Sequence, residues 1–413
     1  MDILASDLLP LVLHDLPAEE RHRVREWCSS ARTVFDAQCS SLTLRDARGG
    51  SSLPSFVSRI LSRGCRPRRV ALDIRRGTLE ERRTCGYAVL DAFKPEHPAD
   101  HSGSRGPSAL ALNITILNSP FAHAVASAFP ALEELDLIAP YGCCRDVYEN
   151  DLDQLAVSEG LSLLLGASSP AGSPGAEEGG GPLLPELTCV RLSFGPAGNA
   201  AWGLTRSSVN ALKGRTGLQE LAMAHAYIDI ARLATPATDL LASLGQLRAL
   251  TLQFEDGSTN PMSALPPVLL ALTALTRLVL GVKNCQRGCE LPLAALAGLP
   301  GLQELDARSI PASVVGLHAL HSLTSLSVLT FRPPPPTGVD DWTRLCLRTS
   351  SSSTVLPPLL RNLSLHAASA PLEVLGALGP LPAGLVTTFP KGAPTLKAEC
   401  GRHTTSNGAL LPC

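Results

Sequence analysis

The chain has 413 residues, of which 45% are apolar, 17% are charged and 4% are aromatic. This apolar content is enough for a large core, so extensive disorder is excluded. The formal net charge of -2 argues against a nucleic-acid partner, which requires a concentrated basic face. No apolar run reaches the roughly 18 residues of a membrane span, and the leucine-rich N-terminus lacks the basic leader of a secretory signal. We therefore expect a cytoplasmic or nuclear protein with mostly reduced cysteines.

Residues 1–41 are predicted to form a small all-α unit. Apolar residues recur at intervals of three and four from Leu4 to Leu16, which is the spacing of an amphipathic helix, although Pro10 lies inside it. Pro17 and the acidic pair that follows it mark the start of a second helix. A unit this small has too little core to fold alone, so we expect it to dock on the first repeat or on a partner.

The same residues resemble a divergent F-box. The family pattern is Leu-Pro, Glu-Leu-Leu, an apolar pair, Leu-Pro, an acidic residue and later Cys-Arg-x-Trp-Arg. The positions that match it in order and spacing are Leu4, Asp7, Leu8, Leu9, Val12, Leu13, Leu16, Pro17, Glu20, Cys28 and Arg32. The departures are Ala5, Pro10, Trp27 and Ala31.

This resemblance implies that the first helix binds a Skp-type adaptor in a cullin-based ubiquitin ligase. The adaptor-binding residues that it implies are Leu4, Leu8, Leu9, Val12, Leu13 and Leu16. The alternative is that this apolar face caps the open end of the repeats that follow, which every repeat array must cover.

Residues 42–397 are predicted to be built from repeated units. One short phrase recurs, with apolar residues at its first, fourth and sixth positions. It begins at Leu132, Leu187, Leu218, Leu247, Leu275, Leu302, Leu323 and Leu360, and weaker phrases begin at Leu42, Val70 and Leu110. The steps from Leu187 to Leu302 are 31, 29, 28 and 27 residues. The end of each phrase alternates as a strand with one buried side does, and leucines at helical spacing follow.

One strand and one helix cannot bury both of their apolar faces, whereas a parallel stack of equivalent units can. The pattern resembles the leucine-rich repeat family. This resemblance implies an α/β solenoid with parallel strands on its concave face and helices on its convex side.

The Asn or Cys that this family places after the strand is absent. The residues at that position are Pro140, Gly195, Ala226, Glu255, Lys283 and Ile310, so the backbone groups of these turns must be satisfied in another way. We also expect loop insertions near residues 94–108, 168–182 and 332–340, and a polar tail over residues 398–413.

If the leucines of each phrase point inward, the residues between them form the exposed concave face. The expected sets are Glu134, Asp136, Ile138; Cys189, Arg191, Ser193; Glu220, Ala222, Ala224; Ala249, Thr251, Gln253; Arg277, Val279, Gly281; Glu304, Asp306, Arg308; Ser325, Ser327, Leu329; and Asn362, Ser364, His366. The residues predicted to contact a protein partner are Glu134, Asp136, Arg191, Glu220, Gln253, Arg277, Glu304, Asp306, Arg308 and His366. Four of these form a charged cluster, Arg277, Glu304, Asp306 and Arg308. The cluster either sets the register of a bound polypeptide or pairs internally across neighbouring strands.

The sequence has no pattern that predicts catalysis. It lacks the phosphate-binding sequences GxxxxGK[ST] and GxGxxG, and it lacks HExxH and GxSxG. Cys285 and Cys289 are four residues apart, but no second pair completes a zinc site. The basic stretch from Arg63 to Arg76 has no aromatic residues and precedes Glu80 and Glu81, which is typical of a solvated face. We therefore expect no enzyme activity, no cofactor and no metal.

Two functions fit this sequence, and both require a protein partner. The first is the substrate-recognition subunit of an SCF cullin-RING ubiquitin ligase, in which the N-terminal helices hold the adaptor and the repeats present a substrate. The alternative is a leucine-rich repeat scaffold without a ligase role, for example in a cytoskeletal or cilium axoneme assembly.

Overall fold

The computed structural model describes residues 39–45, 53–94, 106–139, 151–166, 182–194, 211–213, 215–226, 243–254, 269–282, 293–311, 319–332, 356–366, 381–382, 384–388, 396–399 and 402–405. Most of the predicted N-terminal helical unit, including all six adaptor-binding residues, lies outside this described part. The chain divides into two compact units, Met1–Val190 (unit 1) and Arg191–Cys413 (unit 2), with the boundary inside a strand.

The described residues form fourteen strands, and each strand neighbours the next one along the chain. The strands that begin in unit 1 are β1 (Ser41–Arg45), β2 (Arg69–Asp73), β3 (Ala109–Asn113), β4 (Glu134–Ala139) and β5 (Cys189–Phe194). Those of unit 2 are β6 (Glu220–Ala226), β7 (Ala249–Phe254), β8 (Arg277–Val282), β9 (Glu304–Pro311), β10 (Val328–Arg332), β11 (Asn362–Leu365), β12 (Val386–Thr388), β13 (Leu396–Glu399) and β14 (Arg402–Thr405). The pairs from β1 to β4 and from β6 to β12 are parallel. The predicted α/β leucine-rich repeat solenoid is confirmed.

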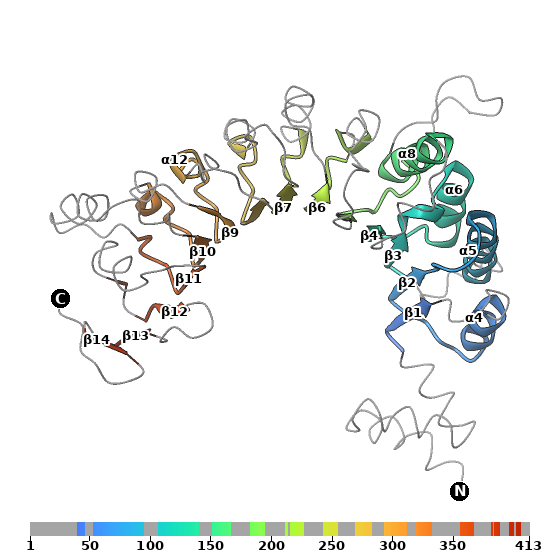
Figure 1. The fold of residues 1–413 in the computed structure, drawn as a ribbon, viewed down its shortest axis with the longest axis horizontal. Helices are drawn as coiled ribbons and strands as arrows, with labels where there is room; N and C mark the ends of the chain where they lie inside the picture. Colours follow the sequence, from blue (N-terminus) through green and yellow to red (C-terminus); the bar gives the residue numbers. More distant parts are fainter. Residues whose placement is uncertain are drawn as a thin grey trace, which may run out of the picture. The chain divides into compact units, whose positions relative to one another are not determined.

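The helices of unit 1 lie on one side of its strands, as Figure 1 shows. They are α4 (Leu53–Ser62), α5 (Leu79–Phe93), η2 (Ile114–Ile116), α6 (Ser119–Ala128) and α8 (Asp151–Leu165). α5 begins with a capping box, in which the Glu81 amide donates to Thr78 Oγ1 (3.2 Å) and the Thr78 amide donates to Glu81 Oε2 (2.8 Å). These two bonds satisfy backbone and side-chain groups that would otherwise be unpaired at the helix start.

The helices that the structure describes between the strands of unit 2 are short. They are α12 (Leu293–Leu296) and η4 (Leu320–Ser322). A tight turn precedes several strands, for example where the Leu247 amide donates to the Leu244 carbonyl at 2.9 Å. In the repeat before it, Arg215 takes the place of Leu244, and burial lowers its pKa to about 10.

A backbone ladder sets the register between neighbouring repeats. The Gln219 carbonyl, which precedes β6, accepts from the amides of both Arg248 (2.8 Å) and Ala249 (3.0 Å) at the start of β7. The same pair of bonds recurs at the carbonyls of Ser40, Arg68, Ser108, Glu133, Arg248, Thr276, Gln303 and Ser327. Each carbonyl therefore fixes the start of the next strand, whatever the length of the loop between them.

This ladder corrects the register that was predicted for the phrase at Leu323. The Gln303 carbonyl accepts from the amides of Ser327 and Val328, so the phrase of β10 begins at Leu326. Leu329 is therefore fully buried and pairs with Leu305, whereas the sequence pattern placed it on the exposed face. Leu323 is buried as well, because it is the turn residue before the phrase.

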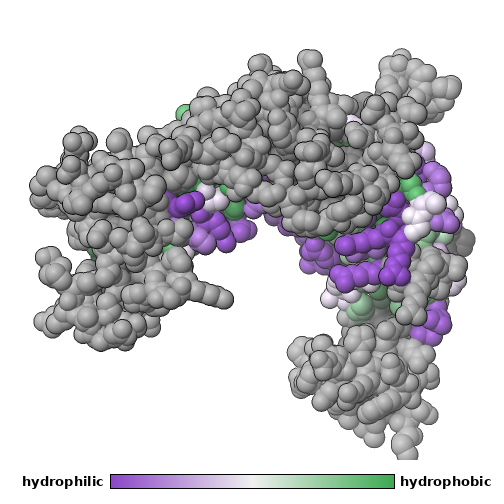
Figure 2. Space-filling model, viewed as in Figure 1, coloured by the Kyte–Doolittle hydropathy of each residue, from purple (hydrophilic) through white to green (hydrophobic). Residues whose placement is uncertain are grey.

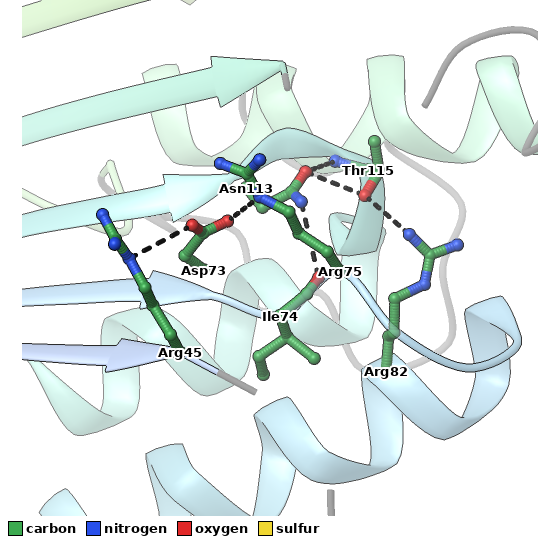
Figure 3. A network of polar contacts seen from close by, with 7 residues as sticks. All are labelled: Arg45, Asp73, Ile74, Arg75, Arg82, Asn113 and Thr115. Carbon is green, nitrogen blue, oxygen red and sulfur yellow. Dashed lines mark hydrogen bonds and ion pairs between the residues drawn. The ribbon is translucent and has the colours of Figure 1, made fainter. Parts of the chain in front are cut away.

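Side chains at positions other than the family's Asn or Cys position satisfy two of the turns. Asn113 accepts from the amide of Thr115 (3.0 Å) and donates through Nδ2 to the Ile74 carbonyl (3.4 Å), as Figure 3 shows. Ser309 Oγ accepts from the Val282 amide at 2.9 Å. Both side chains satisfy a backbone group of the neighbouring repeat. The sequence predicted that these groups must be satisfied in another way, but it did not indicate which residues would do this.

The predicted tail over residues 398–413 includes most of an antiparallel strand pair, β13 with β14. β12 also pairs with β13 in antiparallel sense, so the direction of the strands changes after β12. No helix in the described part of the chain is both long enough and apolar enough to cross a bilayer.

Candidate functional site

The candidate site is the exposed face of the strands in each unit. Along β8 the residues alternate between buried leucines and the more exposed Arg277 and Val279, because neighbouring side chains in a strand point to opposite faces. The parallel register then places equivalent residues of successive strands in rows. One such row contains Ala249, Arg277 and Glu304. Exposed charges on neighbouring strands are thereby brought within contact distance.

In unit 1 an ion pair spans a whole strand. The Arg69 guanidinium on β2 contacts the Asp136 carboxylate on β4. Between them lies β3, whose residues on this face are Ala109 and Ala111. Because both alanines are small, the arginine can lie across β3, and both alanines are buried. The pair therefore depends on three strands being in register.

A second group lies at the carboxyl ends of β1 and β2, and Figure 3 shows it from close by. Asp73 receives two guanidinium groups, with Arg75 Nε at 2.6 Å and Arg45 Nε at 3.7 Å. In the same view, the Arg82 guanidinium lies 3.4 Å from Thr115 Oγ1. The carboxylate of Asp73 thus holds two arginines whose side chains extend toward solvent.

In unit 2 the predicted charged cluster consists of internal pairs. Arg277 Nε lies 3.1 Å from Glu304 Oε2 on the neighbouring strand. Arg308 contacts Asp306 of its own strand, and this hydrogen bond raises the pKa of Arg308. Arg277 therefore pairs across neighbouring strands, as one of the two alternatives predicted, whereas Arg308 pairs within β9. That the cluster sets the register of a bound polypeptide stays a prediction.

Arg191 and Glu220 form a further pair in unit 2. Nε and Nη2 of Arg191 contact the two carboxylate oxygens of Glu220 at 2.8 and 3.1 Å. A bidentate pair of this kind fixes the orientation of the guanidinium plane. Arg191 and Glu220 were both predicted on the exposed face, and both side chains are half-buried.

The arginines of most of these pairs project further into solvent than their carboxylates. The exposed side-chain fractions are 76% for Arg45 against 24% for Asp73, 45% for Arg69 against 14% for Asp136, and 60% for Arg308 against 14% for Asp306. Figure 2 shows hydrophilic surface over β1 to β4 and again over strands of unit 2. In these three pairs the outer layer of the exposed face presents a guanidinium group, and the acid that holds it lies beneath.

The remaining predicted partner-binding residues lie apart from these pairs. Glu134 is half-buried at the start of β4, Gln253 lies over Gly281, and His366 is exposed after β11. Cys189, which the alternation also placed on the exposed face, is buried. Among the described residues, those expected on the exposed face but not found there are Cys189, Leu329 and, through the register of β10, Ser325 and Ser327.

Sequence reasoning missed Arg45, Arg69, Asp73 and Arg75. A signal was present, because the weak phrases at Leu42 and Val70 mark β1 and β2. Arg45 lies on β1, Arg69 and Asp73 lie on β2, and Arg75 follows β2. Extending the alternation rule to those phrases would have placed Arg45, Arg69 and Asp73 on the exposed face. Arg75 lies beyond its strand, so only the structure assigns it to Asp73.

Among the described residues, no group of three or more His, Cys, Asp or Glu side chains is arranged to hold a metal ion. The face also carries no aromatic side chain on β1 to β4 where the structure describes it. What the arrangement offers chemically is a set of oriented guanidinium donors. Such donors bind carboxylates through paired hydrogen bonds.

Among solved structures, the chain is similar to the leucine-rich repeat-containing protein LegL7 from Legionella pneumophila, at 12% identity and a TM-score of 0.38, over 90% of this chain and 92% of that one. It is also similar to the Toll–Spatzle complex of Drosophila, at 13% identity and a TM-score of 0.40, over 86% of this chain and 38% of that one. A third similarity is to the plant peptide hormone receptor RGFR1 in complex with RGF2, at 15% identity and a TM-score of 0.26, over 50% of this chain and 33% of that one. No model of a known protein family matches the sequence, and no curated protein matches it. The fold assignment rests on the strand topology and register.

Proposed function

We propose that the chain is a non-catalytic, cytoplasmic scaffold that binds a protein through the exposed face of its strands. The observation that carries this proposal is the outward position of the arginines in the pairs with Asp73, Asp136 and Asp306. A guanidinium has five N–H donors, so one that already contacts a carboxylate keeps donors for a second. Its pairing also limits its rotamers before a partner arrives, which lowers the entropy cost of binding.

The partner that fits this face is an acidic polypeptide. Oriented guanidinium groups bind carboxylates, and arginine is enriched in protein–protein interfaces. A nucleic acid fits less well, because bases stack on aromatic side chains and the described face of β1 to β4 has none.

The first test measures binding of a poly-glutamate peptide to the full chain. The double variant Arg69→Gln/Arg277→Gln is expected to bind about fivefold more weakly, because two exposed charge contacts of about 0.5 kcal/mol each sum to about 1 kcal/mol. The control Lys94→Gln/Arg361→Gln removes the same charge from exposed residues that lie outside the strands and is expected to bind as the wild type does. Equal loss in both variants would overturn the proposal, and so would tighter binding of a single-stranded oligonucleotide.

The finer part of the proposal is that this scaffold is the substrate-recognition subunit of an SCF cullin-RING ubiquitin ligase. Its support is the resemblance of residues 4–32 to an F-box, on positions that lie outside the described residues. In this function the strand face binds an acidic segment of the substrate, and the N-terminal helices hold the adaptor. The alternative is a scaffold in a cytoskeletal or axonemal assembly, which needs the strand face alone.

The second test asks whether the full-length chain co-purifies with a Skp-type adaptor. The wild type is expected to do so, and Leu8→Asp/Leu9→Asp is expected to lose the adaptor, because two charges would enter an apolar interface. The matched control Leu270→Asp/Leu359→Asp changes two exposed leucines of unit 2 and should retain it. A wild type that captures no adaptor would remove the ligase function and leave the scaffold.

A further inference from the structure

The N-terminal edge of unit 1 has a pocket that shares Arg45 with the arginine pairs of the strand face. β1 is the first strand of the sheet, and no described strand pairs with its outer side. Beside it, a pocket of about 330 Å³ is lined by Thr43, Leu44, Arg45, Leu53, Phe56 and Arg59. These residues come from β1 and α4, which are the first strand and the first helix that the structure describes. The pocket lies between them. An open repeat end of this kind requires a cover.

The pocket combines an apolar floor with a basic rim. Leu44 is buried, and Leu53 and Phe56 are half-buried. The Arg59 guanidinium lies over the Phe56 ring, 6.0 Å from its centre, and is exposed. Arg45 is the other charged residue of the described lining, and none of the described lining residues is acidic. The occupant that fits is therefore apolar with acidic residues beside its apolar ones.

We propose that residues 1–20 of the same chain occupy this pocket. This segment has six leucines, Ile3 and Val12, together with five acidic residues and no Lys or Arg. Its charge is thus opposite to that of the rim, and its side chains match the floor. This is the capping alternative for the apolar face of residues 4–16, and an adaptor would have to displace that face from the pocket.

The connection to the pocket is long enough. The described residues begin at Cys39, directly before β1. Residues 21–38 join the acidic segment to this point, and an extended chain spans up to about 3.3–3.6 Å per residue. The leucines near Leu8 can therefore reach Phe56, and the acids at Asp7 and Asp15 can reach the arginines of the rim.

Photo-crosslinking in the full-length chain tests this directly. Phe56 is replaced by p-benzoylphenylalanine, and the crosslinked peptides are identified by mass spectrometry. We expect crosslinks to residues 1–20 of the same molecule. The same group at exposed Leu359 is the control and should give none to that segment. If the Phe56 variant does not fold, the group is placed at Thr43, which also lines the pocket.

Charge reversal gives a second readout. Arg45→Glu/Arg59→Glu is expected to lower the crosslink yield at least about threefold, because it replaces attraction to the acidic segment by repulsion. Adding Asp7→Arg/Asp15→Arg should restore it. Arg332→Glu/Arg361→Glu, at exposed positions of unit 2, should leave the yield unchanged.

Three results would overturn the inference: crosslinks between two copies of the chain, crosslinks only to residues outside 1–20, or no crosslink at either position. Each would leave the poly-glutamate test of the strand face unaffected. Adaptor binding is also measured separately, so its failure is distinguishable from failure here.

Discussion

Replacing Gly160 by alanine is expected to lower the free energy of unfolding by about 2–3 kcal/mol. Gly160 is buried in α8, and a Cβ there would lie 2.6 Å from the carbonyl carbon and 2.7 Å from the oxygen of Asn118. Both are backbone atoms at the start of α6 and cannot rotate away. In an exposed helix interior the same substitution gains about 1 kcal/mol, so the expected effect has the opposite sign. The measurement is urea unfolding followed by circular dichroism.

Two other glycines serve as references for this result. A Cβ at Gly86 would lie 2.7 Å from the Phe121 ring, and a ring can shift where a backbone cannot, so Gly86→Ala should cost less than Gly160→Ala. A Cβ at Gly245 would meet no heavy atom within 4 Å, so Gly245→Ala should be close to neutral. A Gly160→Ala variant as stable as the wild type would show that α8 does not pack on Asn118 as described.

The repeat fold was predictable from the sequence because leucine periodicity reports burial directly. Leu250 and Leu278 are the fourth residues of the phrases that begin at Leu247 and Leu275. They stand 28 residues apart, and they are partners in neighbouring parallel strands. Both are fully buried. A pattern repeated at nearly constant steps leaves little freedom in how the units stack, so the strands β4 to β9 follow from the sequence.

The register of β10 was not predictable because two phases of the phrase fit the same residues. Leucines stand at 323, 326 and 329, and the spacing of three allows a phrase to begin at either of the first two. Both Leu323 and Leu326 are buried, so burial does not decide between them. The backbone bonds from Gln303 decide, and a sequence pattern does not contain them.

The ion pairs on the strand face were also predictable from the sequence only in part. Arg277 and Glu304 lie in one row of neighbouring strands, so their pairing was an alternative that the sequence itself offered. The pair of Arg69 with Asp136 skips a strand. It exists because Ala109 and Ala111 leave room above β3, which can be seen only once three strands are in register.

The two phases of β10 predict opposite results for two neighbouring substitutions. In the structure Leu329 is fully buried and Val328 is half-buried. Leu329→Ala is therefore expected to cost about 2–5 kcal/mol, the range for a buried leucine. Val328→Ala should cost less than about 1 kcal/mol, because a half-buried valine on the exposed face leaves little cavity. Urea unfolding of the full chain measures both.

The phase that begins at Leu323 reverses this order, since it buries Val328 and exposes Leu329. A costly Val328→Ala with a nearly neutral Leu329→Ala would contradict the observed register. In that register Ser325 and Ser327 would lie on the exposed face. Thr330, which is the neighbour of Asp306 in the observed register, would not. The stability of these two variants therefore decides which side chains a partner meets beside the pair of Arg308 with Asp306.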